Sequence, residues 1–105
     1  MNMVKKNFFD VSGKIIIITG AAGLLGTEYA KGLSKEGANV VLADLDFKKC
    51  KDICLELEKK YSVKPLAINL DLTKISSIKN MVKKVIKKYG KIDVLINNAA
   101  YQGDD

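Results

Sequence analysis

A short β-branched run breaks into evenly spaced glycines near the start of the chain. Residues 15–18 are all isoleucine, Thr19 follows, and Gly20, Gly23 and Gly26 then stand three residues apart as an apolar helical pattern begins. A strand that enters a helix through glycines gathers free backbone N–H groups and the positive end of the helix dipole at one point. This junction predicts a binding site for the phosphates of a nucleotide, within an α/β fold.

Each glycine has a separate physical role in this prediction. Gly20 allows the sharp turn out of the strand, Gly23 allows the backbone to approach phosphate, and Gly26 allows the helix to pack closely on the sheet. The spacing is not the G-x-G-x-x-G fingerprint, because residue 18 is Ile, and it is not a P-loop, because no Gly-Lys-Ser/Thr follows. A glycine-rich helix entry that binds nothing is the alternative.

An acid follows the second predicted strand at the place where a dinucleotide site needs one. Residues 39–43 predict a buried strand, and Asp44 follows them at roughly the 20-residue offset at which an acid meets the adenosine ribose. A carboxylate there accepts hydrogen bonds from the ribose hydroxyls and repels a 2′-phosphate, so Asp44 favours NAD over NADP. The alternative is a solvated loop acid. Lys48 and Lys49 are expected to face solvent on the next helix.

Strand-like and helix-like segments alternate along the whole chain. This alternation predicts an α/β fold with a parallel sheet, right-handed crossovers and helices on both faces. The third helix has an apolar stripe at Ile75, Ile78, Val82, Val85, Ile86 and Tyr89. The predicted strands cover residues 14–19, 39–43, 66–69 and 94–97, and the predicted helices cover residues 24–36, 47–61 and 75–89.

Composition limits the remaining function classes. The chain has 105 residues, which suits one domain, and a net charge of +6 in which all 18 basic residues are lysine. The lysines fall mainly on the polar faces of the predicted helices. A basic chain attracts polyanions, but the lack of arginine removes the side chain best suited to bidentate base and phosphate contacts. We therefore expect no specific nucleic-acid binding.

The two cysteines are expected to be core residues. Cys50 and Cys54 lie four residues apart, which is not the spacing of a redox pair, and the chain has no histidine to complete a zinc site. Reduced thiols and the lack of an export signal or a membrane-spanning run predict a cytoplasmic protein with no metal and no membrane partner.

Four motifs in chain order together resemble the amino-terminal half of a short-chain dehydrogenase/reductase. The motifs are the glycine segment from Thr19 to Gly26, Asp44, the pair Asp71-Leu72, and the segment Asn97-Asn98-Ala99-Ala100. The resemblance implies that residues 1–105 are the amino-terminal portion of an NAD(P)-binding Rossmann domain, a three-layer parallel sheet with strand order 3-2-1-4.

The resemblance also implies roles for individual residues. Asp71 would accept a hydrogen bond from the adenine amino group, and the backbone N–H of Leu72 would meet the ring. Asn98 and Ala99 would line the adenosine ribose, and the backbone at Leu25 would contact the pyrophosphate. Without the resemblance, Asp71 is equally well a helix N-terminal acid and the two asparagines a plain turn.

The sequence departs from the family pattern at two places. Leu24 replaces the second glycine usual in the shorter-chain branch, so the glycine spacing is typical of the extended branch, whereas the Asn-Asn-Ala-Ala segment is typical of the shorter one. The family's catalytic Ser, Asn and Tyr-x-x-x-Lys have no counterpart here. No lysine stands four residues after Tyr29, Tyr61, Tyr89 or Tyr101.

These residues predict a cofactor-binding fragment of an NAD-dependent oxidoreductase that is inactive on its own. In the complete protein the resemblance implies hydride transfer to or from a small carbonyl or alcohol substrate, with tyrosine as general acid/base, and a homo-oligomer. The alternative is a stand-alone nucleotide-binding module. We further expect the apolar strand at residues 94–97 to be a self-associating edge.

Overall fold

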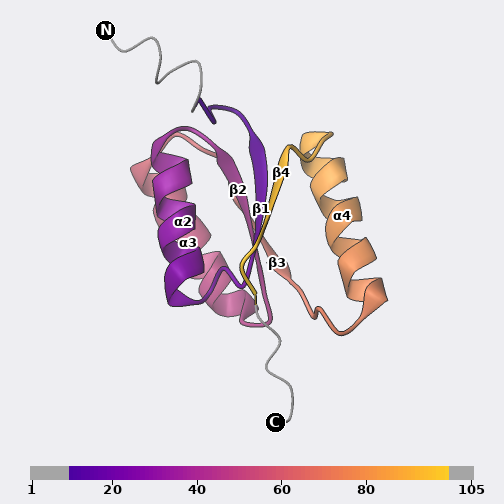
Figure 1. Ribbon diagram of the computed structural model, residues 1–105. Coiled ribbons are helices and arrows are strands. Elements are labelled where there is room, and N and C mark those ends of the chain that lie inside the picture. Colours follow the sequence, from indigo (N-terminus) through magenta and orange to yellow (C-terminus); the bar gives the residue numbers. More distant parts are fainter. Residues whose placement is uncertain (1–9, 100–105) are drawn as a thin grey trace, which may run out of the picture.

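The computed structural model describes residues 10–99, in which four parallel strands form one sheet in the order β3-β2-β1-β4. Helices α2 and α3 cover one face of the sheet and α4 covers the other (Figure 1). The predicted three-layer Rossmann-type architecture and its strand order are confirmed. The elements are β1 (Ile15–Thr19), α2 (Leu24–Lys35), β2 (Asn39–Asp44), α3 (Phe47–Lys60), β3 (Leu66–Asn69), α4 (Ile75–Tyr89) and β4 (Val94–Asn97).

The isoleucines of β1 supply both halves of the core. Ile17 lies opposite Val41 of β2 on one side and opposite Leu95 of β4 on the other. Successive side chains of a strand point to opposite faces. Ile16 and Ile18 therefore pack in the cluster beneath α2 and α3, whereas Ile17 packs in the cluster beneath α4. A continuous β-branched run is what a central parallel strand requires, because both of its faces are covered.

The predicted element ends differ from the observed ends by one residue at four places. The first strand begins at Ile15, the first helix ends at Lys35, the second strand extends to Asp44, and the second helix ends at Lys60. The extension of β2 matters for the site, because Asp44 is the last residue of the strand and pairs with Asn69 of β3. Its carboxylate therefore stands at the carboxyl edge of the sheet.

The predicted apolar stripe of α4 is only partly buried. Ile75 is 72% exposed, and Val82 and Ile86 are 40% and 44% exposed, whereas Met81 and Val85 are buried against the sheet. One helix on this face touches the sheet along a narrow line, so the outer part of its apolar stripe stays exposed. Although α4 is amphipathic, no helix within residues 10–99 is both long and apolar enough to cross a membrane.

The cysteine prediction is confirmed. Cys50 and Cys54 are free, and both are buried in the cluster beneath α2 and α3. Burial raises the pKa of both thiols to about 12, so they stay protonated at neutral pH and act as small apolar core residues.

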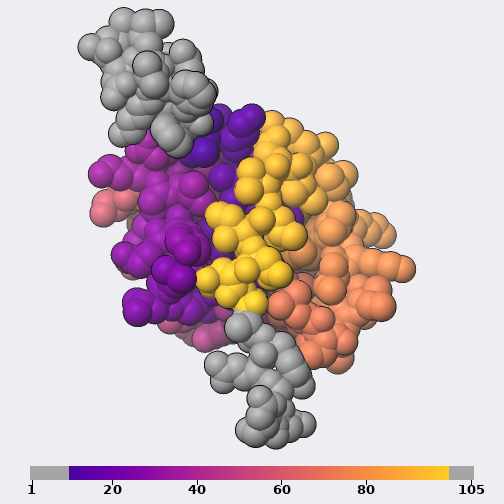
Figure 2. Space-filling model, in the orientation of Figure 1, coloured from indigo at the N-terminus to yellow at the C-terminus, as the bar shows by residue number. Residues whose placement is uncertain are grey.

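The last strand lies at the surface. In the space-filling view, its residues form an uncovered yellow band across the front of the molecule, between the purple and orange parts (Figure 2). Val94 is 42% exposed and Leu95 is 57% exposed, although both are paired with β1.

Candidate nucleotide-binding site

The chain turns sharply between β1 and α2, and two glycines make this turn possible. Gly20 has a φ of +66°, and a Cβ there would lie 2.8 Å from the Cα of Ala99. A Cβ at Gly26 would lie 2.5 Å from the carbonyl oxygen of Gly20 and 2.8 Å from the Cα of Ala21. The close packing predicted at Gly26 is thus against the segment that follows β1 and, at 3.0 Å, against the side-chain amide of Asn98 after β4.

Gly23 has a different environment from the other two glycines. Its φ is −76°, and an added Cβ would approach only the carbonyl oxygen of Gly20, at an ordinary 3.4 Å. It is the N-cap of α2 and provides no side-chain cap. The N–H groups of the first helical turn are therefore left for solvent or for a ligand. The backbone conformation of Gly23 is one that any residue could adopt.

The turn opens onto a cavity at the carboxyl edge of the sheet. The cavity has a volume of about 450 Å³, within the range of small-molecule sites. The end of β2 and the segments that follow β1, β3 and β4 contribute to its wall. The lining residues are Gly20, Gly23, Ala43, Asp44, Leu45, Leu70, Asp71, Leu72, Thr73, Asn98 and Ala99.

Most of the residues expected to form the site line this cavity. Among the nine predicted, only Leu25 and Gly26 are not part of the wall. Leu25 is 55% exposed at the start of α2, where its backbone rather than its side chain was expected to act. Four lining residues were missed, although each stands within two residues of a predicted acid: Ala43, Leu45, Leu70 and Thr73. Adjacency to Asp44 and Asp71 was the signal that could have found them.

Asp44 connects the end of β2 to the glycine turn. One carboxylate oxygen, Oδ2, accepts a hydrogen bond from the backbone N–H of Ala22 at 3.1 Å, and Oδ1 accepts one from the backbone N–H of Asp46 at 2.9 Å. Asp44 also lines the cavity. The carboxylate is therefore held in place by main-chain donors and faces the site, rather than being free in a loop.

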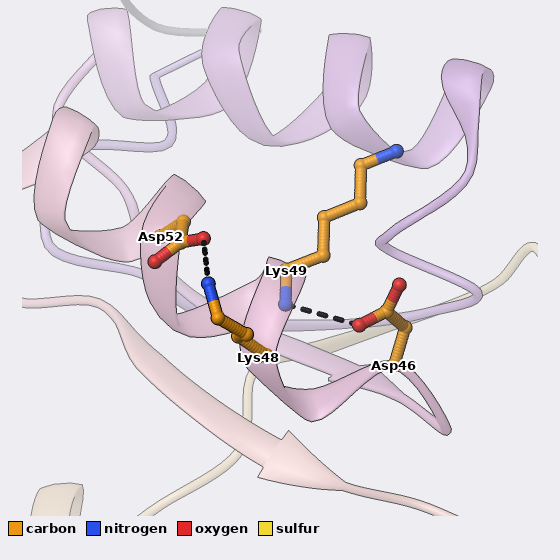
Figure 3. Close-up of polar contacts among 4 residues, drawn as sticks. All are labelled: Asp46, Lys48, Lys49 and Asp52. Carbon is orange, nitrogen blue, oxygen red and sulfur yellow. Dashed lines mark hydrogen bonds and ion pairs between the residues drawn. The ribbon is translucent and has the colours of Figure 1, made fainter.

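Neither lysine near Asp44 forms an ion pair with its carboxylate within residues 10–99. Lys48 donates from Nζ to Oδ2 of Asp52 at 3.3 Å, and the backbone N–H of Lys49 donates to Oδ1 of Asp46 at 3.1 Å (Figure 3). Both lysines are exposed on α3, as the sequence predicted.

Asp71 is held by the segment that follows it. Its Oδ1 accepts hydrogen bonds from the backbone N–H of Thr73 at 3.0 Å and from the Thr73 hydroxyl at 2.6 Å. These hydrogen bonds, the hydroxyl first, lower the pKa of Asp71, so its side chain is ionised and can only accept. Asp71 is not the cap of α4, because the N-cap residue is Lys74.

The segment after β4 is tied to the end of β1. The hydroxyl of Thr19 donates to Oδ1 of Asn97 at 3.0 Å and accepts from the backbone N–H of Ala99 at 3.1 Å. The Asn98 amide donates to the carbonyl oxygen of Gly20 at 3.3 Å. These contacts hold the lining residues Asn98 and Ala99 against the end of β1. Ala100, which completes their motif, lies outside the described residues, as does Tyr101.

The arrangement defines a class of protein. A glycine turn, an uncapped helix N-terminus and two acids surround one cavity at the carboxyl ends of parallel strands, which is the geometry of a Rossmann-type nucleotide-binding domain. Residues 14–105 match the family model described as short chain dehydrogenase, and the chain belongs to the short-chain dehydrogenase/reductase family.

Individual relatives agree with this assignment. The chain is 43% identical over 93 residues to the 12alpha-hydroxysteroid dehydrogenase of a Clostridium species, covering 83% of this chain and 36% of that protein. It resembles the crystal structure of L-sorbose reductase from Gluconobacter frateurii complexed with NADPH and L-sorbose, with a TM-score of 0.83, 30% identity, and coverage of 89% of this chain and 35% of that one. NAD⁺-bound xylitol dehydrogenase gives a TM-score of 0.81 at 32% identity, covering the same shares.

The matched relatives are much longer than this chain. The chain spans about a third of the length of the curated relatives it matches, 36% of two of them and 27% of another. Family membership and the oxidoreductase class follow from these matches, but the activity of a longer protein does not.

Proposed function

We propose that residues 1–105 form the cofactor-binding portion of an NAD-dependent oxidoreductase. The observation that carries this proposal is the convergence of the glycine turn, Asp44, Asp71 and Asn98 on one cavity. The pyrophosphate would lie at the start of α2, where first-turn N–H groups such as that of Leu25 carry the positive end of the helix dipole.

The remaining lining residues would hold the adenosine. Asp44 would accept hydrogen bonds from the ribose hydroxyls, and Asn98 and Ala99 would line the same sugar. The carboxylate of Asp71 would accept from the adenine amino group, with the backbone of Leu72 against the ring. The lining side chains from the end of β2 and from the segments after β2 and β3 are largely apolar, which suits the faces of a purine.

The reaction would be hydride transfer between the nicotinamide and a carbonyl or alcohol carbon. The relatives are named as dehydrogenases and reductases, which supports this reaction class. No tyrosine in the 105 residues is followed by a lysine four positions later, so the general acid/base would come from elsewhere in a longer, oligomeric cytoplasmic protein. We accordingly expect no change in the absorbance of reduced nicotinamide when this chain alone is mixed with cofactor and alcohols or ketones.

A charge placed at Gly23 tests the pyrophosphate site. Gly23→Asp should weaken ADP binding about tenfold or more in calorimetric titration, because its carboxylate would repel the phosphates at short range. Aspartate is a favoured N-cap, so the helix start should be kept. Gly32→Asp makes the same charge change on the exposed part of α2, where an added Cβ meets nothing within 4 Å. Equal ADP affinities for the two variants would overturn the proposed site.

Asp44 tests the choice of NAD over NADP. Structures of relatives hold either NAD⁺ or NADPH, so the choice in this chain rests on the carboxylate that faces the cavity. The chain should bind NAD more tightly than NADP, and Asp44→Asn should narrow the ratio of the two dissociation constants by about tenfold. That change corresponds to about 1.4 kcal/mol. The amide keeps an acceptor for one main-chain N–H, and equal affinities in the unmutated chain would contradict the proposal.

A further inference from the structure

The main chain at Asp71 is held from outside the cavity. The preceding residue, Leu70, donates its N–H to the carbonyl oxygen of Asp44 at 3.0 Å, and the chain then leaves the sheet. The N–H of Asp71 donates instead to the hydroxyl of Ser77, at 2.9 Å in a half-buried position. Ser77 belongs to the first turn of α4, and its own N–H donates to the carbonyl oxygen of Lys74 at 3.1 Å. A helix side chain therefore sets the position of the Asp71 backbone.

One carboxylate oxygen of Asp71 accepts hydrogen bonds from Thr73, and the other can accept a hydrogen bond from a ligand. Thr73 supplies both of the hydrogen bonds that Oδ1 accepts. Within residues 10–99, no donor contacts Oδ2. Asp71 and Thr73 line the cavity, whereas Ser77 does not. Because Thr73 fixes the side chain relative to its own backbone, the direction of the available oxygen follows the position of that backbone.

We propose that Ser77 is a positioning residue that makes the site select a 6-aminopurine over a 6-oxopurine. This inference rests on the proposed function, in which Asp71 faces the purine. An ionised carboxylate only accepts hydrogen bonds, so it attracts the exocyclic amino group of adenine and repels the carbonyl oxygen at the same position of hypoxanthine. The discrimination depends on the oxygen lying within hydrogen-bond reach of that position, and Ser77 holds it there.

The test compares two serines on the same helical turn. Ser77→Ala removes the hydroxyl that holds Asp71, whereas Ser76→Ala removes the hydroxyl of its exposed neighbour. ADP and IDP are titrated into the 105-residue chain and its variants by calorimetry. The unmutated chain should prefer ADP, Ser77→Ala should lower the ratio of the two affinities about fivefold, and Ser76→Ala should leave the ratio unchanged. Ser77→Thr keeps the hydroxyl and should retain the preference.

The ratio separates positioning from stability. A variant that is merely less well folded loses affinity for ADP and IDP alike, so an unchanged ratio in Ser77→Ala would overturn the inference. Tight binding of both nucleotides without preference by the unmutated chain would overturn it too, while leaving the phosphate site in place. Binding of neither nucleotide would instead overturn the proposed function, and this inference with it.

Discussion

Strands β1 and β4 are neighbours in one sheet and have similar sequences, yet their environments differ. Every residue of β1 is at most 3% exposed, whereas Val94 and Leu95 of β4 are 42% and 57% exposed. β1 has a strand on each side and helices over both faces, but β4 has a partner on one side only within the described residues. An apolar strand sequence thus indicates that a segment can be buried, whereas its position in the sheet decides whether it is buried.

The two strands are joined by polar contacts at both ends. At the carboxyl end, the Thr19 hydroxyl bridges Asn97 and Ala99. At the amino end, the carboxylate of Asp93 accepts a hydrogen bond from the backbone N–H of Ile15 at 2.8 Å. The exposed strand is therefore held to the buried one by side-chain hydrogen bonds as well as by the backbone hydrogen bonds of the sheet.

The largest expected difference between the strands is in the cost of truncating a side chain. Ile17→Ala should lower the free energy of unfolding by about 3 kcal/mol, because it leaves a cavity in a closed core. Leu95→Ala, at the paired position of β4, should lower it by less than about 1 kcal/mol, because the side chain is already largely exposed. Chemical denaturation measures both, and equal costs would show that β4 is buried in solution.

A second prediction concerns the hydroxyl that joins the strands. Thr19 is 3% exposed, and Thr19→Val keeps its shape but leaves Asn97 and the N–H of Ala99 without this partner. The free energy of unfolding should fall by about 2 kcal/mol. Amide exchange should also quicken in β4 more than in β2. Uniform quickening across the sheet would show that the contact does not hold β4 specifically.

The exposed edge should also promote self-association. An uncharged apolar strand with a free edge is a template for pairing with another chain, and lysine is a residue that opposes such pairing. Leu95→Lys should weaken self-association in sedimentation experiments about tenfold, which corresponds to about 1.4 kcal/mol. Lys79→Leu, on α4, changes the charge elsewhere and should not weaken it. A monomeric unmutated chain at high concentration would contradict the prediction.

The smallest expected effect is a dependence of stability on pH. The hydrogen bond from the backbone N–H of Ile15, followed by that from Lys91, lowers the pKa of Asp93. The folded pKa lies below the unfolded value of about 3.9, so the contribution is complete above that value and is lost as the pH falls through the folded pKa. The difference in unfolding free energy between the unmutated chain and Asp93→Asn should therefore shrink between neutral pH and about pH 3. A constant difference would assign the effect of the variant to packing.

The cavity shows how much of the site could be predicted from patterns along the chain. Asp44 was predicted from its distance after the glycine segment and Asp71 from the family resemblance, and the structure places both on the cavity wall. The contacts that hold them were not predictable from the sequence. Ala22 lies 22 residues from Asp44 along the chain, and Ser77 belongs to no motif that links it to Asp71. The exposure of Val82 was also missed, because periodicity shows that a face is apolar and not whether anything covers it.

The sequence by itself determined the alternation of strands and helices, the parallel sheet and the glycine turn, because these depend on periodicity and turn chemistry along the chain. The strand order was implied by the family resemblance and is confirmed by the structure. Only the tertiary structure decided that Gly26 packs on the turn, that Asp44 bonds to the Ala22 N–H, and that Ser77 holds Asp71. These contacts join residues that come together only when the strand ends meet at one edge, where hydrogen-bond geometry rather than hydropathy selects the partner.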